Sequence, residues 1–224
     1  LIWLRGSNIT VTLLAGTLDG TGSSNAYDAG EKFGGLVCVN DTGTFTMYGG
    51  TITGGNFTAA YGGNICSTGT VNILGGTVSN GHSAKGGNIN IADGTLTVAN
   101  ASITGGVSTQ WGGNIDINGS GKLTIGGSAE TTVISGGVAA KNGGNIRIDG
   151  AEAELEMSGG SITGGVTSDQ GGNLFTSGKT TITGGSITGG QAMSNSGGNI
   201  AINSKYVVTL ENVSITGGQA KNGG

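Results

Sequence analysis

The chain contains no proline, and charged residues make up only 10% of its 224 residues. No segment holds the 3.6-residue apolar period of a helix over a useful length, and no apolar run approaches the roughly 18 residues of a membrane-spanning helix. The nine lysines and arginines form no cluster, so the sequence offers no electrostatic footprint for nucleic acid. These absences argue against a helical fold, a helical membrane span and a nucleic-acid partner.

Glycine is abundant, with 51 residues, and this level alone would suggest a disordered segment. Disordered chains, however, lack the apolar residues that recur here at fixed places between the glycines. The formal net charge is only -4, spread evenly along the chain. We therefore predict one folded domain over residues 1–224. Residues 1–33 would form a first coil or N-terminal cap. The apolar start is read as a first strand or cap, or as the trimmed start of a longer chain, rather than as a signal peptide.

One four-residue word, Gly-Gly-Asn followed by an apolar residue, recurs along the chain. Its copies lie 24 to 31 residues apart, about 27 on average, and a weaker first copy has Leu36 in place of asparagine. Residues 222–224 read as the beginning of a further copy, so we expect another coil to follow there, from more chain or from a second molecule. A fixed period of this length indicates a repeat architecture. The asparagines of the word are Asn64, Asn88, Asn114, Asn145, Asn173 and Asn199.

Each repeat carries three short segments in which apolar and polar residues alternate, as strands do. Three strands in about 27 residues predict one coil of a right-handed parallel β-helix, with about eight coils over residues 34–224 and the cap. Three columns of apolar residues, beginning at Val37, Met47 and Ile52, are expected to fill its core.

The recurring asparagine suggests a ladder along one corner. A buried Asn side chain can bond to the Asn one coil away and can also cap backbone groups. The simpler alternative is that Asn merely tolerates the left-handed conformation, but that role would admit Gly or Asp as well. We favour the ladder.

Cys38 and Cys66 are the only cysteines, and each lies two residues after the third letter of its word. The register predicts that they share a column on adjacent coils, and alternation places them on the outer face. Neighbouring strands bring such residues within the Cα separation of a disulfide. The sequence is compatible with a disulfide and equally with two free thiols that happen to align. A disulfide would indicate an oxidising compartment.

Several other residues suggest chemistry at first sight. Glu152, Glu154 and Glu156 lie along one strand face, where a surface ion ladder between Lys122 and Lys179 is expected rather than a catalytic acid cluster. The lone His82 has no partners for a metal site. Phe33, Tyr61 and Trp111 mark one corner, as corner filling or as a strip on which sugars stack. We expect no cofactor, no bound metal and no catalytic residues.

The segment "GTFTMYGGTITGG" (residues 43–55), the word "GGNI" and the word "SITGG" resemble the repeats of large secreted bacterial β-helix proteins. These are adhesin-like surface proteins with the pectin-lyase-like fold. The words are also similar to the repeats of chlamydial polymorphic outer membrane proteins. The resemblance covers about residues 8–224 and implies an extracellular or cell-surface location, with surface glycans or a host surface as partners.

The resulting functional prediction is an extracellular structural or adhesive solenoid that stacks head to tail with copies of itself. One alternative is a carbohydrate-active enzyme of the polysaccharide-lyase type, for which Asp116 and Arg147 align on adjacent coils. The other is an ice-binding face of outward hydroxyl pairs, interrupted at Val133. Its positions include Thr51, Thr53, Ser102, Thr104, Ser161, Thr163, Ser186, Thr188, Ser214 and Thr216.

Overall fold

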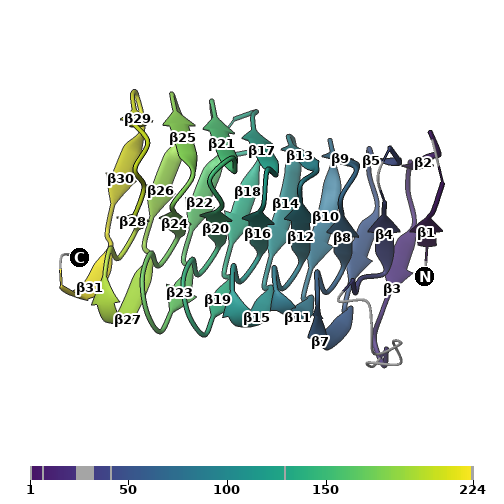
Figure 1. The fold of residues 1–224 in the computed structure, drawn as a ribbon, viewed down its shortest axis with the longest axis horizontal. Coiled ribbons are helices and arrows are strands. Elements are labelled where there is room, and N and C mark those ends of the chain that lie inside the picture. Colours follow the sequence, from purple (N-terminus) through teal and green to yellow (C-terminus); the bar gives the residue numbers. More distant parts are fainter. Residues whose placement is uncertain (1, 7, 24–32, 41, 129, 223–224) are drawn as a thin grey trace.

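The computed structural model describes residues 2–6, 8–23, 33–40, 42–128 and 130–222. This part of the chain contains strands and turns but no helix, and it forms a parallel β-solenoid. Figure 1 shows the coils stacked side by side along one axis, with the two ends of the chain at opposite ends of the rod. The all-β solenoid with about 27 residues per coil is thus confirmed.

The strands form four parallel sheets, which we call A to D. Sheet A consists of β1 (Ile2–Leu4), β4 (Val37–Val39), β8 (Ile65–Ser67), β12 (Ile89–Ala92), β16 (Ile115–Asn118), β20 (Ile146–Asp149), β24 (Leu174–Thr176) and β28 (Ile200–Ile202). Sheet B consists of β2 (Thr10–Leu13), β5 (Thr44–Met47), β9 (Thr70–Ile73), β13 (Thr95–Val98), β17 (Lys122–Ile125), β21 (Glu154–Met157), β25 (Lys179–Ile182) and β29 (Val208–Leu210).

Sheets C and D complete the coils. Sheet C consists of β3 (Thr17–Asp19), β6 (Thr51–Thr53), β10 (Gly76–Ser79), β14 (Ala101–Thr104), β18 (Val133–Ser135), β22 (Ser161–Thr163), β26 (Ser186–Thr188) and β30 (Ser214–Thr216). Sheet D consists of β7 (Asn56–Tyr61), β11 (His82–Lys85), β15 (Val107–Trp111), β19 (Val138–Ala139), β23 (Val166–Thr167), β27 (Gln191–Ser196) and β31 (Gln219–Asn222). About seven complete turns result, close to the expected eight.

Sheet D is a fourth strand per coil where the sequence predicted three. Its strands vary from two residues (β19) to six (β7), and the register shifts within the pairs that β11 makes. Its buried positions hold small residues such as Ser83, Ser108 and Ala139 rather than large β-branched ones. Because these segments have neither a constant length nor an apolar period, the sequence did not predict them as strands. Their variable length explains part of the uneven spacing between the Gly-Gly-Asn words.

The three predicted core columns are confirmed. Val37, Met47 and Ile52 are fully buried, as are their counterparts on the following coils through Leu174, Ile182 and Ile187. The last described coil differs, because it is covered on one side only. There Leu210 is 42% exposed and Ile215 38% exposed, although both lie in register with the core columns.

Candidate functional site

The asparagines of the repeated word form a continuous ladder along the corner between sheets D and A. Asn88 shows the full pattern: its Oδ1 accepts from Asn64 Nδ2 (2.7 Å) and from the Gly81 amide (2.8 Å). Its Nδ2 donates to the Thr104 carbonyl (2.9 Å) and to Asn114 Oδ1 (2.7 Å). Every polar group of this buried amide is therefore satisfied. The ladder continues through Asn145, Asn173 and Asn199.

The two glycines of the word have separate roles. Gly62 has a φ of 69°, a left-handed conformation that favours glycine, and a Cβ there would collide with the Ile65 carbonyl. At Gly63 a Cβ would collide with the Gly87 carbonyl of the next coil. The first glycine turns the chain, and the second lets adjacent coils approach closely enough for the ladder to form.

Cys38 and Cys66 are Cα partners on β4 and β8, so the predicted shared column is confirmed. Alternation with the core residues places them on the outer side of sheet A, but the expectation that this side is exposed was wrong, because both side chains are buried. No disulfide joins them in this structure. Burial raises the pKa of the Cys66 thiol well above its usual range, and its hydrogen bond with Cys38 adds to the shift. A thiol held in its protonated form is a poor nucleophile.

Further along the same column, Asp116 and Arg147 form a buried ion pair. Arg147 Nη1 lies 2.8 Å from Asp116 Oδ1, and Arg147 Nη2 also bonds to Asp149. Asn90 and Asn118 each donate to Asp116 Oδ2 at 3.0 Å. Burial raises the pKa of the Asp116 carboxyl, while the Arg147 charge and the Asn118 bond oppose that shift.

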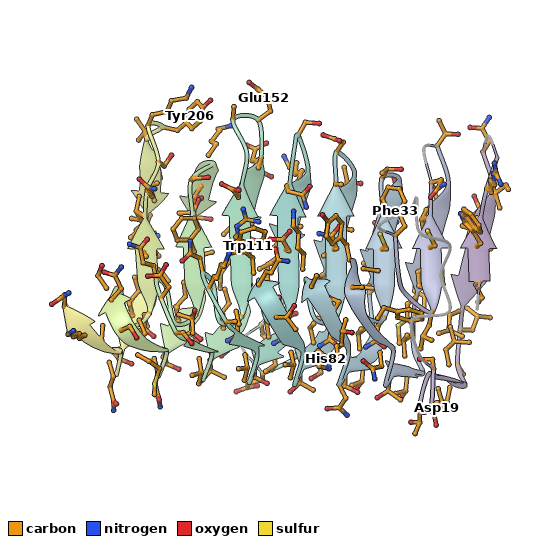
Figure 2. The ribbon with its side chains drawn as sticks, turned by 60° about the horizontal axis from the view of Figure 1, so that its bottom comes forward. Asp19, Phe33, His82, Trp111, Glu152 and Tyr206 are labelled. Carbon is orange, nitrogen blue, oxygen red and sulfur yellow. The ribbon has the colours of Figure 1, made fainter. Side chains whose placement is uncertain are left out.

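Trp111, on the strand before this cluster, lies against Arg147 and between lysines of the neighbouring coils. Its ring centroid is 4.5 Å from the Arg147 guanidinium carbon, 5.0 Å from Lys85 Nζ and 4.8 Å from Lys141 Nζ. Lys85 also lies 4.5 Å from the Tyr61 ring. Figure 2 shows Trp111 near the middle of the rod. Because cations already occupy the ring, this arrangement favours corner filling over sugar stacking.

The Trp111 corner also lies beside the column that contains the cysteines, because the ring contacts Arg147 of that column. The residue before each Gly-Gly pair, such as Tyr61 or Trp111, lies five positions before the outward residue of sheet A in the same coil, Cys66 or Asp116. Sequence reasoning noted both sets but did not connect them. The constant separation of five residues between the two positions was the available signal.

The acidic strand β21 forms the expected surface ion ladder. Glu154 Oε1 lies 2.6 Å from Lys179 Nζ, and Glu154 Oε2 lies 3.4 Å from Lys122 Nζ. Lys122 also reaches Glu156 at 2.9 Å. The hydrogen bond from Lys179 is the largest cause that lowers the pKa of Glu154. All of these side chains are at least partly exposed, so each contact contributes little to stability.

The remaining candidates are His82, a metal-binding group and a membrane-spanning helix. His82 faces Asn56 and Val107 in the outward file of sheet D. Among the described residues, no three His, Cys, Asp or Glu side chains gather into a metal-binding group. None of the described segments is a helix that could cross a bilayer.

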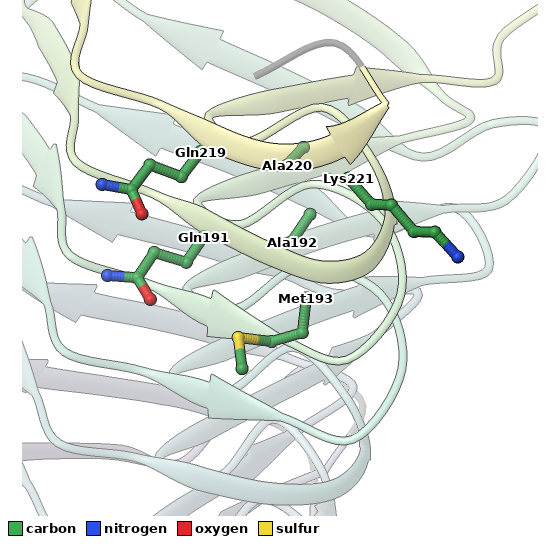
Figure 3. A pocket seen from close by; sticks show the side chains of 6 residues that line it. All are labelled: Gln191, Ala192, Met193, Gln219, Ala220 and Lys221. Carbon is green, nitrogen blue, oxygen red and sulfur yellow. The ribbon is translucent and has the colours of Figure 1, made fainter.

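Three hollows lie on the last described coils. One, of about 220 Å³, lies on β27 and β31, and Figure 3 shows the Gln191 and Gln219 amides side by side there, with Met193 beside them. Another hollow, of about 480 Å³, is lined by Ser196 and Ala201. These small residues occupy the positions that Trp111 and Asp116 hold on an earlier coil. A third is lined by Ile202, Leu210 and Ile215 at the open face of the rod.

The outward positions of sheet C carry the predicted hydroxyl pairs in register. Thr51 and Thr53 pair with Thr77 and Ser79, and the same two files continue to Ser214 and Thr216. Val133 interrupts one file, as expected. Comparisons with models of protein families, with curated proteins and with solved structures found no match to this chain.

Proposed function

We propose that this chain is an extracellular structural and adhesive solenoid that stacks end to end with copies of itself. The observation that supports this most is that the last described coil has open strand edges and exposed apolar side chains. Among the described residues, its strands β28 to β31 each pair on one side only, and the core-column residues Leu210 and Ile215 are exposed there, as is the neighbouring Ile202. Open strand edges beside exposed apolar side chains are a template for another strand layer.

The first coil offers a matching surface. Ile2, Leu13 and Leu18 lie in the same core columns, in register with Val37, Met47 and Ile52. A second copy placed head to tail would therefore continue sheets A, B and C and pack apolar residues on apolar residues. Such a contact joins two different surfaces and does not close, so repetition makes a filament.

Light scattering across the micromolar range, together with electron microscopy, tests the stacking. We expect the mean mass to rise with concentration and single-solenoid filaments to be visible. Ile215→Glu places a charge in the contact and should abolish association, whereas Ser214→Glu, on the adjacent outward position, should not. Monodisperse monomers at every concentration would refute end-to-end stacking.

The adhesive and extracellular parts of the proposal rest on the resemblance of the repeats to those of secreted adhesin-like proteins. Binding of the labelled chain to immobilised glycans and to cell surfaces tests them, with the Ile215→Glu monomer separating adhesion from self-association. The polysaccharide-lyase alternative is less well supported, because Asp116 and Arg147 bond to each other, and Asp116 also accepts a hydrogen bond from Asn90.

A further inference from the structure

The outward face of sheet C is an array of hydroxyl groups, which we call the hydroxyl face. Each of its eight strands presents two outward residues. Apart from Asp19 at one end and Val133 inside, these are Thr17, Thr51, Thr53, Thr77, Ser79, Ser102, Thr104, Ser135, Ser161, Thr163, Ser186, Thr188, Ser214 and Thr216. The strand pairs keep one register from β3 to β30. The face is therefore uncharged over seven consecutive strands.

Glycines flank this face on both sides. The residue after the outward pair has a positive φ on most coils, as at Gly54, Gly105 and Gly164, and the residue before it is Gly160 or Gly185 on β22 and β26. The glycines have no side chain that could rise above the hydroxyls, although the exposed Asn80 follows the pair on β10. From β14 to β30 the two files therefore form a surface that a flat partner can approach.

Hydrogen bonds between coils fix part of the array. The Ser79 hydroxyl donates to Thr53 (3.0 Å), Ser135 to Thr104 (3.2 Å) and Thr188 to Thr163 (3.2 Å). Each bond sets a rotamer and still leaves oxygen lone pairs for a further partner. Behind the face, the fully buried Ile103, Ile134 and Ile162 hold the strands in place. The hydroxyls of these three pairs are thus ordered before anything binds.

The dimensions of the face narrow the choice of partner. Strands repeat at about 4.8 Å and the two files lie about 6.6 Å apart, so eight strands cover only a few hundred Å². A stable protein partner needs about 800 Å² on each side. The face carries no charge to recognise an ionic ligand, apart from Asp19 at its end. With a stable protein partner and an ionic ligand excluded, the face best fits an ordered surface that repeats in two dimensions and offers hydrogen bonds at every repeat.

We propose that the hydroxyl face binds ice. Oxygen atoms in the surface planes of ice repeat at distances close to those of the two hydroxyl files. A rigid array meets such a lattice without the ordering cost that mobile side chains would incur. This inference goes beyond the structural role and does not depend on end-to-end stacking.

Thermal hysteresis and the shape of ice crystals grown in the purified protein test this proposal. We expect hysteresis and faceted crystals from the unmodified chain. Thr163→Tyr raises a bulky ring in the middle of the face and should reduce hysteresis to the level of an inert protein. Val138→Tyr, at a 43% exposed outward position of sheet D, is the matched control and should leave hysteresis unchanged. Circular dichroism confirms that both variants fold.

A gain-of-function variant separates ice binding from a merely structural role. Val133 lies in the file between Ser102 and Ser161, so Val133→Thr completes the row. We expect greater hysteresis from Val133→Thr than from the unmodified chain. Absence of hysteresis and of crystal shaping in the unmodified chain would overturn the proposal, as would equal losses in Thr163→Tyr and Val138→Tyr.

Discussion

Asparagine suits the corner because its short side chain carries an amide that is both donor and acceptor. Asn114 accepts from Asn88 and from the Gly106 amide, and it donates to the Ser135 carbonyl and to Asn145. An aspartate would offer no donor and would bring a charge into a site with no exposure to solvent. The identity of this residue is therefore set by both its own coil and the next.

Replacing Asn114 by alanine should lower the free energy of unfolding by about 3–5 kcal/mol, since several buried groups lose their partner at about 1–3 kcal/mol each. Urea denaturation measures this loss. Asn203→Ala is the control, because Asn203 is exposed, and a change within about 0.5 kcal/mol is expected there. Similar values for the two variants would show that the ladder does not support the fold.

At the scale of a strand, the row of glutamates on β21 resembles a catalytic acid cluster in sequence but forms surface ion pairs in the structure. Its glutamates alternate with the buried Leu155 and Met157, so the acids lie on the outer surface of sheet B. Lysines on the strands to either side, Lys122 and Lys179, face Glu154. The strand thus pairs charge with charge across three coils.

The Glu154 contacts give a pH dependence with a defined sign. Lys179 and Lys122 lower the pKa of Glu154 in the folded chain. A lowered pKa stabilises the fold above the ordinary Glu pKa of about 4.3, and that stabilisation is lost as the pH falls through the lower, folded-state value. Glu154→Gln should therefore reduce stability at neutral pH by less than about 1 kcal/mol, given the exposure of the pair.

Melting curves of the unmodified chain and Glu154→Gln at neutral pH and near pH 2 check this expectation. The two should differ at neutral pH and converge in acid, where the carboxyl is protonated in both the folded and unfolded states. A difference that persists in acid would mean that the substitution acts through packing instead of charge.

The whole molecule is a one-dimensional stack in which each coil contacts only the coils before and after it. Lys85 and Trp111 are register partners, so residues 86–111 make up one full coil. Removing them should leave every column, the ladder included, in register across the new junction.

The chain without residues 86–111 should therefore fold into a rod shorter by about 4.8 Å, one strand spacing. Circular dichroism and small-angle scattering measure both properties. Removing residues 86–98 alone, about half a coil, is the control, and it should prevent cooperative folding because sheets A and B lose a strand that C and D keep. Equal behaviour of the two deletions would contradict the stacked-coil account.

Much of the fold could be read from periodicity, because a solenoid repeats the same local environment on every coil. Val37, Met47, Ile52 and their counterparts were placed in the core on that basis, and the ladder asparagines were placed along one corner. Sheet D was missed, since its strands change length from coil to coil and its inward residues are small.

The sequence by itself determined which residues stack on which, because the recurring words align one coil with the next even where the spacing between them varies. Only the tertiary structure decided which faces are covered. Cys38, Cys66, Asp116 and Arg147 alternate with core residues and so read as outward, yet they are buried. At Arg147 the physical reason is that the fourth strand brings the Trp111 ring against the guanidinium group. Alternation along one strand carries no information about a neighbouring corner.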